Sequence, residues 1–159
     1  RLLSRGLGDV YKRQPEGRRI FSNLTVEENL IVAFRKGYWD LNKIKKNFPR
    51  LSERLTQMSN SLSGGEQQML AIARTLMTNP KMLILDEATE GLSPNIRNEI
   101  WTIISEIKKK EVSIILVDKY LNKIKQIADK LYILDRGENA WNGKPYLLTD
   151  QIIKKYLSV

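Results

Sequence analysis

The sequence predicts an α/β fold in which a parallel sheet core is accompanied by a separate helical subdomain. Two observations support this prediction. After Pro80, short apolar runs alternate with amphipathic stretches, and strands that alternate with helices form parallel sheets with right-handed crossovers. Before Pro80 the chain is rich in helical patterns, which indicates a helical subdomain. The 159 residues are enough for one domain with a hydrophobic core.

Capping residues mark the start of each helix expected in the helical subdomain. Thr25 pairs with Glu28 in a capping box, Asp40 is a second cap, and Ser63 pairs with Glu66 in another capping box. The expected helices run over residues 25–34, 40–48 and 63–79. Gly37 ends the first helix and Pro80 ends the third. Residues 49–60 are expected to form a polar connection that contains one possible short helix.

The core is expected to contain two apolar strands, three helices and a hairpin. The strands lie over residues 82–85 and 112–117, and the hairpin turns at Asp135, Arg136 and Gly137 between residues 131–134 and 139–141. The first of the three helices is expected to start at Pro94 or Asn95. The second is expected to run from Leu121 to about Lys130, and the third to begin after Asp150, its N-terminal cap. The inward residues of the first are Ile96, Ile100, Ile103, Ile104 and Ile107, and those of the last are Ile152, Ile153, Tyr156 and Leu157.

Composition excludes several kinds of chemistry. Cysteine and histidine are absent, so disulfides, thiolate metal sites and histidine bases are excluded, and catalysis must use carboxylates, lysine, hydroxyls or backbone groups. No apolar run is long enough to span a bilayer. The net charge of +9 indicates either a solvated basic surface or attraction to anionic lipid; no nucleic-acid motif accompanies it, so no nucleic-acid partner is expected.

The run LSGGEQQ at residues 62–68 predicts a helix start built to hold an anion. Ser63 and Glu66 form the capping box, and Gly64 and Gly65 leave backbone N–H groups open to a phosphate. One helix later, the run MLILDE at 82–87 has the pattern of a buried parallel strand ending in two carboxylates, where α/β sheets place their sites. The two runs together indicate nucleotide chemistry.

In this order, the two runs resemble the signature motif and the Walker B strand of ATP-binding cassette (ABC) ATPases. The resemblance covers residues 15–159 and implies the C-terminal part of a P-loop NTPase domain of the ABC type. PEGRRIF at 15–21 and LTVEENL at 24–30 resemble the second ATPase subunit of branched-chain amino acid importers. Residues 1–14 do not fit, and their end looks like sequencing-adapter read-through. The expected parts are a non-native leader (1–14), a Q-loop and signature subdomain (15–80) and the Walker B core (81–159).

The resemblance implies a role for each residue of the site. Asp86 holds Mg²⁺, usually through water, and Glu87 orients and polarises the attacking water. Ser63, Gly64 and Gly65 donate hydrogen bonds to the γ-phosphate of an ATP held by a second subunit, so the catalytic unit is a dimer.

Three further residues complete the expected site. Glu66 belongs to the same nucleotide-binding motif. Glu16 stands where most ABC proteins have the Q-loop glutamine and is expected to contact Mg²⁺; this branch of the family commonly has glutamate there. Lys119 stands where most have a switch histidine, and it either donates to the γ-phosphate or is an ordinary surface lysine. Ser93 takes the place of the D-loop aspartate.

A P-loop, GxxxxGK[ST], is absent from the 159 residues. The chain is therefore interpreted as an N-terminally truncated fragment that hydrolyses no ATP by itself. The resemblance implies that the full protein is an ATP-hydrolysing subunit powering bacterial import of branched-chain amino acids. Its partners would be integral membrane permease subunits, a second ATP-binding subunit in a homo- or heterodimer and, indirectly, a substrate-binding protein. It would lie at the cytoplasmic face of the inner membrane. A soluble non-transport ABC ATPase and a urea or amide importer subunit remain alternatives.

Overall fold

The computed structural model describes residues 11–14, 20–110 and 112–157 of the chain. The chain divides into two compact units, of which the first ends at Asp118 and the second begins at Lys119. The described residues contain no helix that is long and apolar enough to cross a membrane.

A parallel sheet is the base of the first unit, as the sequence predicts, and it has one strand more than the two expected. Its order is β1 (Tyr11–Gln14), β2 (Met82–Asp86) and β3 (Ser113–Val117). Met82 pairs with Ser113 and Asp86 with Val117, so β2 and β3 end together at one edge. The residues of β1 come from the segment that the sequence analysis leaves out of the fold. Backbone hydrogen bonding, which does not depend on side-chain pattern, places them beside β2.

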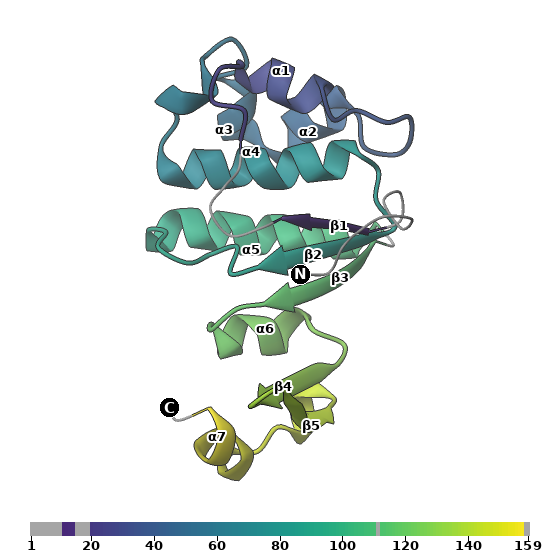
Figure 1. The fold of residues 1–159 in the computed structure, drawn as a ribbon, viewed down its shortest axis with the longest axis vertical. Helices are drawn as coiled ribbons and strands as arrows, with labels where there is room; N and C mark the ends of the chain where they lie inside the picture. The colour runs from purple at the N-terminus through teal and green to yellow at the C-terminus, as the bar shows by residue number, and fades with distance from the viewer. Residues whose placement is uncertain (1–10, 15–19, 111, 158–159) are drawn as a thin grey trace. The chain divides into compact units, whose positions relative to one another are not determined.

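The helical subdomain consists of α1 (Val26–Ile31), α2 (Leu41–Asn47), α3 (Pro49–Ser52), the 3₁₀ turn η1 (Ser59–Ser61) and α4 (Gly64–Met77). Figure 1 shows α1, α2 and α3 together on one side of α4, and the sheet with α5 (Pro94–Lys108) on the other. The predicted caps are confirmed, because the hydroxyls of Thr25 and Ser63 and the carboxylate of Asp40 each accept from a backbone N–H three residues on.

The core of the first unit lies between these layers. Leu83 and Leu85 of β2 are fully buried, and so are Ile100, Ile104 and Ile107 on the predicted inward face of α5. Ile96 is only half-buried because it lies in the first turn of α5. The apolar face predicted for α4, which includes Met69 and Ile72, is buried as well.

Helix α1 is three residues shorter than predicted, and the reason is a long-range contact. The backbone N–H of Arg35 donates to the carbonyl of Met77 at 2.8 Å, which draws the chain away toward the end of α4. Asn79 then fixes the segment: its side chain accepts from the N–H of Trp39 at 2.6 Å and donates to the carbonyls of Arg35 and Trp39. A Cβ on Gly37 would clash with the Asn79 side chain, which these hydrogen bonds hold in place, so glycine is favoured there.

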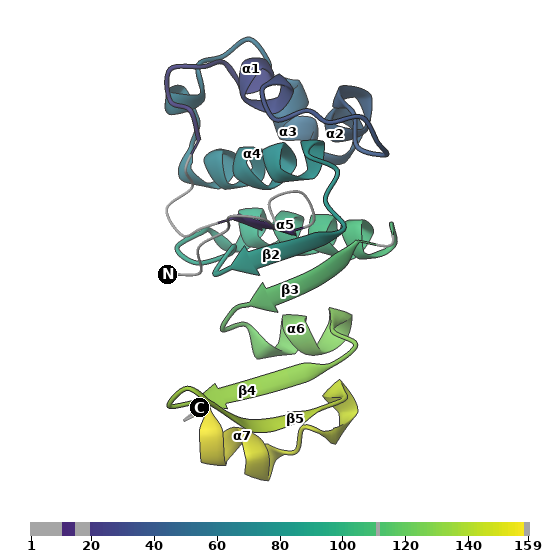
Figure 2. The same cartoon turned by 45° about the vertical axis from the view of Figure 1, so that its right-hand side comes forward.

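The second unit contains α6 (Leu121–Ile127), the antiparallel strands β4 (Leu131–Asp135) and β5 (Glu138–Gly143), the 3₁₀ turn η2 (Pro145–Leu147) and α7 (Asp150–Tyr156) (Figure 2). Arg136 and Gly137 form the predicted hairpin turn with φ of 50° and 85°, the signs that a type I′ turn requires. Leu131, Ile133 and Leu148 are the buried centre of this unit.

Two predicted boundaries in the second unit are wrong by a few residues. Helix α6 ends at Ile127 and does not reach Lys130, because Ala128 already has extended backbone geometry. The cap of α7 is Thr149, whose hydroxyl accepts from the N–H of Ile152, while Asp150 is the first helical residue. An acidic residue in the first turn still stabilises the helix through its dipole.

Candidate functional site

Asp86, predicted to hold Mg²⁺, and Glu87, predicted to activate water, follow one another at the end of β2. Asp86 is the last residue of β2 and is half-buried, whereas Glu87 is exposed. Glu87 has a φ of 51°, in the left-handed region that few non-glycine residues adopt. Its N–H donates to the carbonyl of Val117 at 2.9 Å, and its carbonyl accepts from Glu90 N–H at 3.1 Å. The chain therefore makes a strained, sharp turn that presents Glu87 at the edge of the sheet.

Two side chains that the sequence analysis did not single out hold this turn. The amide of Gln68 on α4 donates to the carbonyl of Ala88 at 2.8 Å. The hydroxyl of Thr89, which is fully buried, donates to the carboxylate of Asp118 at 2.6 Å. No local pattern points to Thr89 or Asp118, because they meet only when β2 and β3 pair. Gln68 does lie within the LSGGEQQ run, but its partner is twenty residues away.

The start of α4 has the geometry expected of an anion-binding helix end. Ser63 is exposed, and its hydroxyl accepts from the N–H of Glu66 at 3.4 Å. The first N–H groups of a helix have no partner within the helix, and its dipole makes this end partly positive. Figure 1 shows this end of α4 on the same side of the first unit as the ends of β2 and β3.

Gly65 has a packing reason to be glycine besides the one predicted. It is buried, and a Cβ at this position would lie 2.5 Å from Cγ2 of Ile96 in the first turn of α5. A contact that short is not tolerated, so the absence of a side chain lets α4 and α5 approach closely. Gly64 beside it is half-buried.

The carboxylate of Glu66 is turned back toward the helix cap. It accepts from the N–H and the hydroxyl of Ser63 at 2.9 and 2.8 Å and from Nε of Arg54 at 2.9 Å. Burial acts to raise the pKa of Glu66, but the hydrogen bonds from Ser63 and the charge of Arg54 outweigh it, so the pKa lies below its ordinary value. Glu66 is therefore ionised at neutral pH, and its carboxylate holds Ser63 in position.

We expect Glu66→Gln to lower the free energy of unfolding by about 1–2 kcal/mol at neutral pH, since it removes a charge-assisted hydrogen bond to a buried carboxylate. Because the folded pKa is the lower one, the native carboxylate stabilises the fold above its unfolded pKa of about 4.3 and ceases to do so as pH falls through the folded value. Urea unfolding at pH 7 and pH 3 would check this; an equal difference at both pH values would contradict it.

Two of the predicted site residues have no placement relative to this site. Glu16 lies outside the described residues. Lys119 is exposed and is the first residue of the second unit, whereas Asp86 and Glu87 belong to the first. Within the described ranges, no three His, Cys, Asp or Glu side chains gather as a metal cluster. A Mg²⁺ ion that binds together with a nucleotide needs only one or two protein carboxylates beside phosphates and waters.

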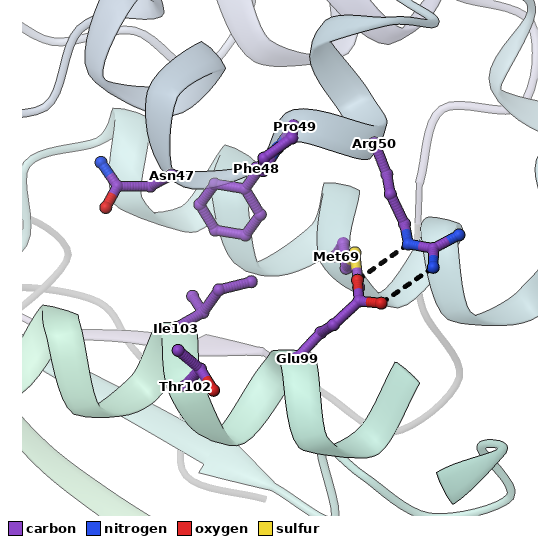
Figure 3. Close-up of a pocket in the computed structure, with 8 residues that line it drawn as sticks. All are labelled: Asn47, Phe48, Pro49, Arg50, Met69, Glu99, Thr102 and Ile103. Carbon is purple, nitrogen blue, oxygen red and sulfur yellow. Dashed lines mark hydrogen bonds and ion pairs between the residues drawn. The ribbon is translucent and has the colours of Figure 1, made fainter. Parts of the chain in front are cut away.

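A separate apolar cavity of about 280 Å³ lies where α2 and α3 meet α4 and α5. Figure 3 shows Arg50 and Glu99 at this cavity, joined by two hydrogen bonds of 2.8 Å. The cavity is lined by Asn47, Phe48, Pro49, Arg50, Met69, Glu99, Thr102 and Ile103. None of the predicted site residues is among them, so this cavity is separate from the candidate site.

Comparisons with known proteins agree with this geometry. The model of the ABC transporter family matches residues 5–90, and thus begins within the segment set aside as a leader. The chain is 44% identical over 153 residues to the high-affinity branched-chain amino acid transport ATP-binding protein BraG of Pseudomonas aeruginosa. This match covers 90% of the chain and 64% of the Pseudomonas protein. It is 31% identical over 161 residues to the Nod factor export ATP-binding protein I of Rhizobium etli, covering 96% of the chain and 49% of that protein.

Solved structures give the same result. A nucleotide-free ATP-binding cassette from an ABC transporter matches with a TM-score of 0.71 at 25% identity, over 94% of the chain and 65% of that structure. The ADP conformation of MJ1267, an ATP-binding cassette of an ABC transporter, matches with a TM-score of 0.68 at 26% identity, over 94% of the chain and 64% of that structure. The chain thus spans about half to two thirds of the length of these relatives. Its sheet, its signature helix and the family match show that the chain belongs to the ABC transporter family and has the fold of an ATP-binding cassette.

Proposed function

We propose that the protein containing this chain is the ATP-binding and ATP-hydrolysing subunit of an importer of branched-chain amino acids. The observation that carries the proposal is the placement of Asp86 and Glu87 at the end of a buried parallel strand, on the same side of the unit as the capped start of α4. The name of the Pseudomonas relative, at 44% identity, supports the substrate class. The Nod factor export relatives make export a second candidate function. It is favoured less, because the chain is only about 31% identical to these relatives.

The chain's own residues divide the work of ATP hydrolysis as follows. Asp86 would hold the Mg²⁺ that binds with ATP, an ion that would neutralise phosphate charge, and Glu87 would accept a proton from the attacking water. Ser63 and the N–H groups of Gly64 and Gly65 contribute donors to the γ-phosphate of a nucleotide held by a second subunit. The subunit works with membrane permease subunits at the cytoplasmic face, and indirectly with a substrate-binding protein.

A chimeric protein tests this function. In the chimera, the chain is joined to the part of the Pseudomonas relative that it does not match. Reconstituted with the permease subunits of that relative in proteoliposomes, the chimera is expected to hydrolyse ATP and to drive uptake of labelled leucine, isoleucine or valine. ATP hydrolysis without uptake would reject the importer assignment, and co-purification with ribosomes would favour a soluble ABC ATPase. An absence of hydrolysis would reject the proposed activity.

Lys119 is proposed to replace the switch histidine as a fixed positive donor to the γ-phosphate. In the chimera, we expect Lys119→Ala to lower ATP turnover more than ADP affinity, since ADP has no γ-phosphate and charge-assisted contacts to phosphate are strong. Lysine does not titrate near neutral pH, so no histidine-like loss of activity between about pH 6 and 7 is expected from this position. Steady-state turnover and ADP titration would check this, with the exposed Lys154→Ala on α7 as the control. Equal turnover in Lys119→Ala and the parent would make Lys119 an ordinary surface lysine.

A further inference from the structure

Gln68 is a buried polar side chain that joins α4 to the turn carrying Glu87. It is 7% exposed, and its Nε2 donates to the carbonyl of Ala88 at 2.8 Å. Ala88 is 1% exposed and directly follows Glu87. Buried polar groups are almost always paired, because an unmade hydrogen bond in the interior is costly. The bond therefore fixes the Ala88 carbonyl relative to the axis of α4.

The turn needs such a restraint because Glu87 is in the left-handed region. A strained backbone conformation persists only where the surrounding structure holds it from several sides. On the side of the sheet, the Glu87 N–H donates to Val117 of β3, and Thr89 donates to Asp118. On the side of the helical subdomain, Gln68 supplies the restraint. The turn is thus tied both to the sheet and to α4.

The helix that holds the turn is also the helix whose first turn faces the phosphate in the proposed function. Ser63 and Gln68 are five residues apart in the chain, which is about 7.5 Å along a helix that rises 1.5 Å per residue. The capping box of Ser63 and Glu66 ties the helix start to its first turn. A small displacement of the helix start therefore moves Gln68 and the Ala88 carbonyl with it.

We propose that Gln68 is a positioning residue for ATP hydrolysis, which sets the place of the Glu87 carboxylate through the Ala88 carbonyl and links it to phosphate binding at the start of α4. The proposal rests on the proposed function, because it takes Glu87 as the group that activates water. Gln68 itself touches neither the nucleotide nor the water. Its contribution is to keep Glu87 within the narrow range of positions that in-line attack requires.

Hydrogen–deuterium exchange on the 159-residue chain tests the positioning role without nucleotide. Gln68→Met keeps the length of the side chain and removes the donor, and it is expected to speed exchange at the amides of Glu87 and Glu90, which the turn protects. Thr75→Val is the matched control, since it removes a side-chain hydrogen bond to the Ala71 carbonyl on the same helix and leaves the turn intact. Unchanged exchange at both amides in Gln68→Met would overturn the proposal.

Steady-state kinetics of the chimera test the catalytic consequence. Gln68→Met is expected to lower kcat by roughly 10–10²-fold with little change in KM for ATP, because a misplaced catalytic group affects the transition state more than binding. Gln68→Leu, which also lacks a side-chain donor, should behave alike and serves as the second variant if Gln68→Met does not fold. A purely structural role would lower the melting temperature and leave kcat at the parent value well below that temperature.

The outcomes separate this proposal from the function on which it rests. An active parent whose Gln68→Met and Gln68→Leu variants keep the parent kcat would overturn the role of Gln68 and leave the proposed function standing. An inactive parent would overturn the proposed function and the catalytic role of Gln68 with it, while the exchange experiment would still decide whether Gln68 holds the turn.

Discussion

Glu87→Gln in the chimera is expected to lower ATP turnover by roughly 10²–10⁴-fold, the usual worth of a general base. Glutamine has the shape of glutamate but cannot accept the proton of the attacking water at neutral pH. The exposed position of Glu87 beyond the end of β2 and its strained backbone are consistent with a residue placed for chemistry and not for packing.

The measurement is phosphate release in steady state, together with ATP binding by equilibrium dialysis. Binding should survive, because the substitution removes only the charge. Glu90→Gln, which removes an exposed carboxylate from the same turn, is the control and should keep a turnover near that of the parent. If Glu87→Gln turned over ATP at the parent rate, Glu87 would not be the base.

Ser63→Arg is expected to abolish the ATP-dependent dimer of the chimera. Ser63 is exposed at the start of α4, so a long cationic side chain there would occupy the space of the partner's nucleotide. It would also remove the acceptor for the Glu66 N–H, and the loss of an N-cap alone costs about 1 kcal/mol. Bulk is expected to dominate, because a cap loss of this size leaves the fold intact.

Gel filtration with ATP, in the Glu87→Gln background that retains the nucleotide, would measure the dimer. Ser63→Ala separates the loss of the cap from the added bulk and should dimerise more strongly than Ser63→Arg. Asn42→Arg adds the same side chain at an exposed position on α2 and should leave the dimer unchanged. A dimer of parental stability in Ser63→Arg would remove the start of α4 from the nucleotide sandwich.

The agreement between sequence and structure is best where the determining contacts are local. The capping boxes at Thr25 and Ser63 join residues three apart, and both appear as predicted. The type I′ turn at Arg136 and Gly137 follows from the same short range of the chain. The errors, at the ends of α1 and α6 and at the cap of α7, are shifts of one to three residues at boundaries, where helix propensity changes gradually and a distant contact decides.

By itself, the sequence determined the fold class and the family and put two adjacent carboxylates at the end of a buried strand, because periodicity, caps and two motifs are local properties of the chain. Tertiary structure alone decided the rest. Pairing of β2 with β3 brings Thr89 to Asp118, and packing of α4 on α5 makes glycine obligatory at Gly65. Packing also brings Gln68 to Ala88 across twenty residues, beside the left-handed backbone of Glu87. Such contacts depend on how whole elements pack, and burial makes their hydrogen bonds obligatory only after the elements have met.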